Sequence, residues 1–219
     1  MFKAVVHDGS LLGFAGTRAN RFFFFGSRHV TRLDMEARFP HYSFHYLKQV
    51  HGRSVIQAQS GTPEADGHFT DQPGHALVIQ SADCVPVLLA GNRRVGALHA
   101  GWRGVAQNIV DASRAHLQAE FAAIGPHIAF ASFEVGADVK DRLTQACPGE
   151  GSRLFRAGAH GKYFFDLKSG VRAQLHGAFS MGLEIVEQTN DTLTDQTFNS
   201  FRRDRQAAGR NLSFVVINP

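Results

Sequence analysis

The chain has 219 residues, a formal net charge of +4, 43% hydrophobic and 19% charged residues, a composition typical of a folded protein rather than a disordered one. Its two cysteines exclude a disulfide scaffold, so we expect a reducing, cytoplasmic setting. No apolar stretch reaches the roughly 18 residues that a membrane span requires. Lys3 and Asp8 interrupt the segment where a signal peptide would have its apolar core, so we expect neither a secretory leader nor a membrane partner.

The basic residues are dispersed along the sequence. The densest cluster, Arg202-Arg203-Asp204-Arg205, contains its own acid. Nucleic-acid surfaces more often show a basic stripe with interleaved aromatic residues, so no nucleic-acid partner is expected. A mild positive excess instead suits a small anion such as phosphate, which one or two arginines can hold.

Hydrophobic patterning predicts one mixed α/β domain over residues 1–219. Strands are expected at Phe2–Val6, Phe22–Phe25, Leu47–Gln57 with an interruption at His51-Gly52, His75–Gln80, Val85–Ala90, Arg94–His99, Ala122–Phe130, Leu183–Val186 and Leu212–Ile217. Helical periodicity is expected over Val105–Phe121, Glu134–Thr144 and Val171–Phe179. The stretch Asp34–Tyr46 has no clear period. Because strands alternate with helices, a layered α/β sandwich is expected rather than an all-β barrel.

The expected strands Val85–Ala90 and Arg94–His99 form a predicted hairpin. Gly91-Asn92 between them is a favoured two-residue turn, and a turn centred there places Cys84 opposite His99. A turn centred one residue later pairs His99 with Pro86, which keeps His99 on the face that Cys84 uses. Under either register, a thiol and an imidazole converge at one end of the hairpin.

A glycine-rich segment, Ala100-Gly101-Trp102-Arg103-Gly104, joins this hairpin to a predicted helix. Backbone N–H groups at such a helix start bind anions, and Arg103 would add a fork of donors. A tight turn that needs glycine for a positive φ is the structural alternative for the same residues.

Several longer motifs occur in a characteristic order. They are Lys48-Gln49-Val50-His51-Gly52, Ala65-Asp66-Gly67, Ser81-Ala82-Asp83-Cys84-Val85-Pro86-Val87, Leu98-His99-Ala100-Gly101-Trp102-Arg103-Gly104, Ile124-Gly125-Pro126, Phe133-Glu134-Val135-Gly136, Phe165-Asp166-Leu167, Phe201-Arg202-Arg203-Asp204 and Gly209-Arg210. From about Leu47 onward the chain therefore resembles the YfiH-like laccase-domain family, once called multicopper polyphenol oxidoreductases and later assigned purine nucleoside phosphorylase activity.

The resemblance implies that His51, Cys84 and His99 bind one zinc ion. Two imidazoles and a thiolate suit zinc and leave a fourth tetrahedral position open, as catalytic zinc requires. None of the twelve histidines forms the His-X-His pairs common in multicopper centres. Copper is expected only as an opportunistic occupant, because it binds most nitrogen and sulfur sites more tightly than zinc does.

The implied reaction is phosphorolysis of a purine nucleoside such as adenosine, inosine or methylthioadenosine, with adenosine deamination as a related activity. Cys84, His99 and Arg103 are the expected catalytic residues, and Arg103 and Arg28 the expected substrate-binding ones. The family's Ser-Thr-Arg-X-Gly-Gly segment is changed here to Gly26-Ser27-Arg28-His29, which leaves Arg18 as a rival to Arg28.

Two carboxylates accompany these residues. Asp66 is expected to orient a zinc-bound histidine through its free ring nitrogen, or else to cap a turn. Asp83 is a candidate acid or base, or else forms structural hydrogen bonds. The structural role is favoured, because in a strand Asp83 would point to the face opposite that of Cys84. Arg202 and Arg203 are expected to brace Asp66 or Asp166.

Two other classes of function fit the same residues. A cysteine hydrolase would use Cys84 as nucleophile and His99 as base, and would suit editing of peptidoglycan precursors. A non-catalytic metal-binding or partner-binding module is the other alternative. The sequence does not define the oligomeric state, and a monomer is compatible with it.

Overall fold

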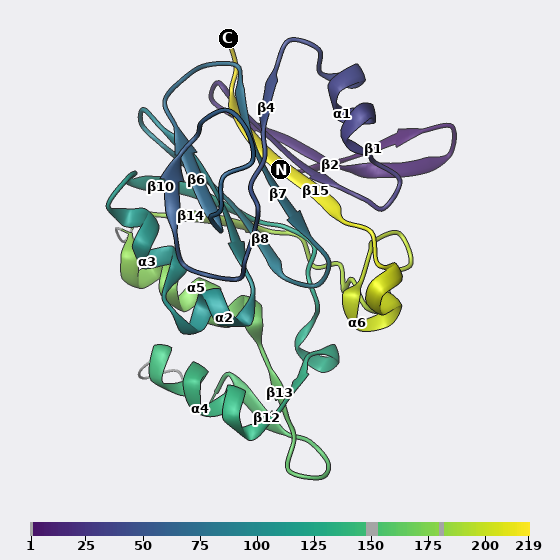
Figure 1. Ribbon diagram of the computed structural model, residues 1–219, viewed down its shortest axis with the longest axis vertical. Helices are drawn as coiled ribbons and strands as arrows, with labels where there is room; N and C mark the ends of the chain where they lie inside the picture. The colour runs from purple at the N-terminus through teal and green to yellow at the C-terminus, as the bar shows by residue number, and fades with distance from the viewer. Residues whose placement is uncertain (1, 148–152, 180–181) are drawn as a thin grey trace.

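The computed structural model describes residues 2–147, 153–179 and 182–219, and it contains two packed six-stranded sheets (Figure 1). The first sheet has the order β1 (Lys3–His7), β2 (Ser10–Arg18), β3 (Arg21–Gly26), β15 (Asn211–Ile217), β7 (His75–Ser81) and β4 (Ser43–His45). The second has the order β14 (Glu184–Glu187), β10 (Ala119–Ile124), β8 (Val85–Gly91), β9 (Val95–Ala100), β6 (Gly67–Thr70) and β5 (Val55–Gln57). A small third sheet joins β11 (Glu134–Val135), β13 (Tyr163–Phe165) and β12 (Phe155–Ala157).

The helices lie outside the two large sheets. They are α1 (Arg32–Arg38), α2 (Trp102–Ala106), α3 (Ile109–Arg114), α4 (Ala137–Ala146), α5 (Leu167–Ala178) and α6 (Phe201–Asp204), with 3₁₀ turns η1 (Phe130–Ser132) and η2 (Arg205–Ala207). Of these, α1, α2, α3 and α5 pack on the outer faces of the two sheets. Figure 1 shows α2, α3 and α5 beside the second sheet and α1 beside the first. The predicted α/β sandwich is thus confirmed. No helix in the described ranges combines the length and apolarity needed to cross a bilayer.

Burial on both faces explains the uninterrupted apolar runs in the central strands. In β3, Phe23 and Phe25 pack between the two sheets, while Phe24 packs on the α1 side. In β8, Leu88 points between the sheets and Leu89 points toward the helices. Alternate side chains therefore enter different cores, and neither face needs polar residues.

The hairpin of β8 and β9 adopts the second of the two predicted registers. Pro86 pairs with His99, so the turn is centred on Asn92-Arg93 and the pairing of Cys84 with His99 is wrong. Gly91 is the last residue of β8 and not part of the turn. A Cβ at this position would lie 2.1 Å from the Gln118 carbonyl oxygen, so no larger residue fits there. This glycine is required for close approach of β10 rather than for the turn.

Several predicted boundaries are also wrong. The expected Val105–Phe121 helix is two short helices and the start of β10, because Asn108 has a φ of 58° and ends the first helix. In the expected Leu47–Gln57 strand, only β5 is extended. The stretch Asp34–Tyr46, which shows no clear hydrophobic period, contains most of α1 and all of β4. The sequence patterns also did not predict strand β2.

Candidate metal centre and its cavity

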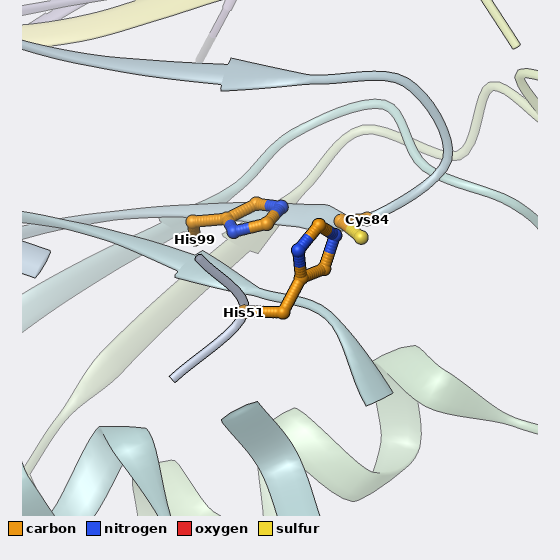
Figure 2. A group of neighbouring side chains, drawn as sticks. All are labelled: His51, Cys84 and His99. Atoms are coloured by element: carbon orange, nitrogen blue, oxygen red, sulfur yellow. The ribbon is translucent and has the colours of Figure 1, made fainter. Parts of the chain in front are cut away.

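Three side chains from separate segments meet at one end of the second sheet. Cys84 precedes β8, His99 lies near the end of β9, and His51 lies in the loop before β5. One ligand atom from each residue lies within 4.8 Å of the others, and Figure 2 shows the two rings and the sulfur turned toward one another. His99 is buried, Cys84 is partly buried and His51 is exposed, so the group reaches from the core to the surface.

The loop that carries His51 is held by one carboxylate. The fully buried Asp66 accepts hydrogen bonds from the backbone N–H groups of Val50, His51 and Gly52, at 3.1, 2.9 and 2.7 Å. His51 adopts a φ of 61°, an uncommon conformation outside glycine that these three bonds stabilise. The same bonds explain why this segment leaves the expected strand.

Asp66 also fixes the tautomer of His99. Its Oδ1 lies 2.8 Å from His99 Nδ1, and both side chains are buried. Burial alone would raise the pKa of Asp66, but hydrogen bonds from His99 and Gly52 outweigh it and lower the pKa, so the group is a carboxylate. Nδ1 therefore donates its proton to Asp66, and Nε2 remains to face Cys84 or a metal ion.

The cysteine and histidine also polarise each other. Burial disfavours ionisation of Cys84, but the His99 charge and hydrogen bonds from both histidines lower its pKa from 9.0 to about 6. Burial likewise opposes protonation of His99, but the Cys84 thiolate and Asp66 raise its pKa from 6.5 to about 9. Each group of the metal-free pair thus favours the charged form of the other.

These residues form part of the lining of a cavity of about 710 Å³, large enough for a nucleoside-sized ligand. Arg103 and Trp102 line it from the start of α2, and the Arg103 guanidinium carbon lies 4.8 Å from the centre of the Trp102 ring. Gly101 leaves room for the Cys84 side chain, because a Cβ at position 101 would lie 2.8 Å from the Cys84 sulfur.

Comparison with known proteins decides the family. Residues 27–218 match the family model described as "Multi-copper polyphenol oxidoreductase laccase". The chain belongs to this family. It is 33% identical over 178 residues to the purine nucleoside phosphorylase of Xylella fastidiosa, covering 74% of this chain and 68% of that protein. It is 36% identical over 177 residues to the Deinococcus radiodurans purine nucleoside phosphorylase, covering 76% and 67%.

Solved structures support the same assignment. The Neisseria meningitidis protein NMB0706 has a TM-score of 0.85 at 27% identity and covers 95% of this chain and 100% of its own. YlmD from Geobacillus stearothermophilus has a TM-score of 0.81 at 27% identity, covering 92% and 93%. The sequence alignment with the curated YlmD phosphorylase spans 65% of that protein's length.

The donor set of this laccase-family member fits a metal ion such as zinc. Donors bound at 2.0–2.3 Å around a tetrahedral ion lie about 3.5 Å apart, which is within the 4.8 Å limit of the group. Two imidazoles and an acidified thiol supply one soft and two borderline donors, and the buried carboxylate on His99 is the partner that metal-bound histidines usually have.

Asp83 lies in the cavity lining, beside Cys84. It lies in a turn with a φ of 88°, not in a strand. Its carboxylate accepts a hydrogen bond from the Thr192 hydroxyl at 2.7 Å and another from the Arg202 backbone N–H at 2.6 Å. These bonds connect the turn that presents Cys84 to the start of α6.

The structure does not bring the other predicted arginines to their expected partners. Arg28 lies outside the cavity lining, with its Nη1 3.3 Å from the Gln196 carbonyl oxygen. Arg203 pairs with the neighbouring Asp204 at 2.8 Å, and the Arg202 side chain donates to the Glu134 carbonyl oxygen at 3.0 Å. Neither of these two arginines braces Asp66 or Asp166 through a bond in the described residues.

Sequence reasoning missed part of the cavity wall. Phe201, Arg205 and Arg210 line the cavity from the C-terminal segment, and Lys48 lines it beside the His51 loop. The Phe201 side chain is 44% exposed, whereas Phe198, three residues earlier, is fully buried. Three of these four residues stand in the family motifs, but nothing in their spacing indicated that they face the metal group.

Proposed function

We propose that this chain is a zinc-dependent purine nucleoside phosphorylase. The observation that carries the proposal is the convergence of His51, Cys84 and His99 on the wall of a nucleoside-sized cavity that also contains Arg103. The relatives described above agree with it, since several are called purine nucleoside phosphorylase.

The reaction exchanges one bond at the anomeric carbon. An oxygen of inorganic phosphate forms a bond to C1′ while the bond from C1′ to the purine N9 breaks. The base leaves with the electron pair and takes up a proton, and the products are free base and ribose 1-phosphate. No oxidant or reductant is needed.

The chain's own residues supply position and charge. Arg103, stacked on Trp102, holds the attacking phosphate with a planar fork of donors. Asp66 holds the His99 ring through Nδ1, which leaves Nε2 as the atom available to the metal ion. Zinc held by the three ligands would supply Lewis-acid stabilisation of developing negative charge.

Product analysis tests the proposal. Zinc-loaded protein is incubated with adenosine, with and without phosphate, and the products are identified by chromatography. We expect adenine and ribose 1-phosphate only when phosphate is present. Inosine formed irrespective of phosphate would instead establish the deaminase activity, and no turnover with bound nucleoside would favour a non-catalytic module.

Two variants test the assigned residues. Cys84→Ala should lose most bound zinc by elemental analysis, whereas wild-type metal content would refute the ligand set. Arg103→Ala should retain zinc and fold but lose about 10²-fold or more in phosphate-dependent rate, by analogy with lost oxyanion donors. Arg114→Ala removes an exposed arginine of α3 that pairs with Asp111, and serves as the matched control.

One observation also favours the cysteine-hydrolase alternative. Cys84, His99 and Asp66 form a chain from nucleophile to base to orienting group, and the neighbouring His99 lowers the pKa of the Cys84 thiol. A hydrolase needs no third ligand, whereas His51 completes a metal site. Hydrolysis of amide substrates that persists after chelation of all metal would establish this alternative.

A further inference from the structure

The cavity lining carries more positive charge than inorganic phosphate requires. Its basic residues are Lys48, Arg103, Arg202, Arg205 and Arg210, and its one carboxylate among the described residues is Asp83. That carboxylate already accepts two hydrogen bonds. One or two arginines suffice for a phosphate ion, so most of this charge has no role in phosphorolysis of an uncharged nucleoside.

Some of these cations have other roles. Lys48 lies 3.2 Å from Glu64, and Arg202 donates to a carbonyl and lies over the Phe133 ring. Among the residues that the structure describes, no partner forms a hydrogen bond or ion pair with the Arg205 side chain. Within the same residues, the Arg210 side chain donates through Nη1 alone, to the carbonyl oxygens of Ala208 and Gly209. Arg205 and Arg210 therefore have guanidinium donors available to a ligand.

These two arginines occupy a different wall from Arg103. Arg103 lies in the first turn of α2, close after His99, whereas Arg205 is the first residue of the η2 turn and Arg210 directly precedes β15. Figure 1 shows α2 and α6 apart, on either side of the ends of β7 and β8. Two separate groups of cations in one cavity indicate two anionic groups rather than one.

On the basis of the proposed function, we propose that the preferred substrate is a purine nucleoside 5′-monophosphate, whose phosphate ester binds Arg205 and Arg210 while inorganic phosphate binds Arg103. The exposed Phe201 ring on the same wall offers an apolar surface to the nucleotide. The cavity of about 710 Å³ accommodates a nucleotide together with a phosphate ion.

The chemistry balances in the same way as for a nucleoside. A phosphate oxygen bonds to C1′ as the bond between C1′ and N9 breaks, and the base leaves with the electron pair and gains a proton. The products are the free purine and ribose 1,5-bisphosphate. The 5′-phosphate takes no part in bond exchange and contributes binding only.

Calorimetric binding to the zinc-loaded full chain tests the inference independently of turnover. We expect adenosine 5′-monophosphate to bind about 10-fold or more tightly than adenosine, because charge-assisted hydrogen bonds to a phosphate are strong. Saturating inorganic sulfate, used in place of phosphate so that no phosphorolysis takes place, should leave this preference in place. Equal binding of the two ligands, or loss of the preference with inorganic sulfate, would overturn the second anion site even if the protein is a phosphorylase.

Two probes and two variants fix the position of the site. Adenosine 3′-monophosphate carries the same charge and should bind no more tightly than adenosine, whereas tight binding of it, or tighter binding of single-stranded RNA, would overturn the proposal. Arg205→Gln and Arg210→Gln should each reduce the ratio of nucleotide to nucleoside affinity several-fold. Arg114→Ala, the exposed control, should leave the ratio unchanged, and circular dichroism verifies that each variant is folded.

If nucleotide binding shows this pattern but no purine is released, the anion site stands and the phosphorylase proposal fails. If purine is released from adenosine and the nucleotide has no advantage in kcat/KM or affinity, the phosphorylase proposal stands and the anion site fails. The two proposals are therefore separable with the same protein preparations.

Discussion

Replacement of Asp66 by asparagine tests the physical basis of the metal centre. In the native protein, Oδ1 accepts from His51 N–H and His99 Nδ1–H, and Oδ2 accepts from Val50 N–H and Gly52 N–H. An asparagine has one acceptor oxygen. Whichever way its amide is oriented, two of the four donors face an NH₂ group instead of an oxygen.

The expected cost follows from these four bonds. A hydrogen bond to a charged group contributes about 1.5–3 kcal/mol, so the loss of two at a buried site should lower the free energy of unfolding by about 3–6 kcal/mol. Zinc affinity should fall about 10–100-fold, because His99 and the His51 loop lose the group that orients them. The lowered pKa of Asp66 keeps it ionised down to acidic pH, so its stabilisation is present above about pH 4 and is lost as the pH falls further.

Urea unfolding of the metal-free protein at pH 7, followed by fluorescence of Trp102, the single tryptophan, measures the first effect. Competition with a colorimetric chelator measures zinc affinity. Asp71→Asn is the control, because Asp71 is exposed and its contacts are a long ion pair with Arg94 at 3.8 Å and a hydrogen bond from the neighbouring Gln72. It should change the free energy of unfolding by less than about 0.5 kcal/mol. A loss below about 1 kcal/mol for Asp66→Asn, with unchanged zinc affinity, would refute the role assigned to this carboxylate.

Three further predictions concern the surrounding structure. Gly101→Ala should lower zinc content, since its Cβ would lie 2.8 Å from the Cys84 sulfur, whereas Gly177→Ala, with open space around it, should not; equal metal content by elemental analysis would contradict this. Burial and the nearby His45 charge lower the pKa of His68 to about 3, so the unfolded state binds the proton first and stability falls as the pH drops below about 6.5. Between pH 7 and 5, urea unfolding should show wild type losing roughly 2 kcal/mol more than His68→Leu, and parallel pH profiles would exclude the effect. Thr192→Val removes the hydroxyl donor to the turn that presents the metal-binding cysteine, and should reduce stability by about 1–2 kcal/mol and zinc affinity several-fold in the chelator assay.

The amino-acid sequence alone determined the layered architecture and the convergence of Cys84 and His99, whereas His51 was assigned to the same group by the family resemblance. The two possible hairpin registers both place Cys84 and His99 on one face, so the error in the turn position did not alter that convergence. The alternation of strand and helix patterns likewise predicted the sandwich, since periodicity is a local property that each segment carries by itself.

Only the tertiary structure decided the lining of the cavity. β15 pairs with β3 and β7, and this long-range pairing brings the segment with Phe201, Arg205 and Arg210 to the turn that carries Cys84. The same holds for Asp83, whose hydrogen-bond partners lie more than a hundred residues away in the sequence. Such neighbours leave no periodic signal, because they are set by how β15 inserts between β3 and β7, and so the charge of the cavity is visible only once the chain is folded.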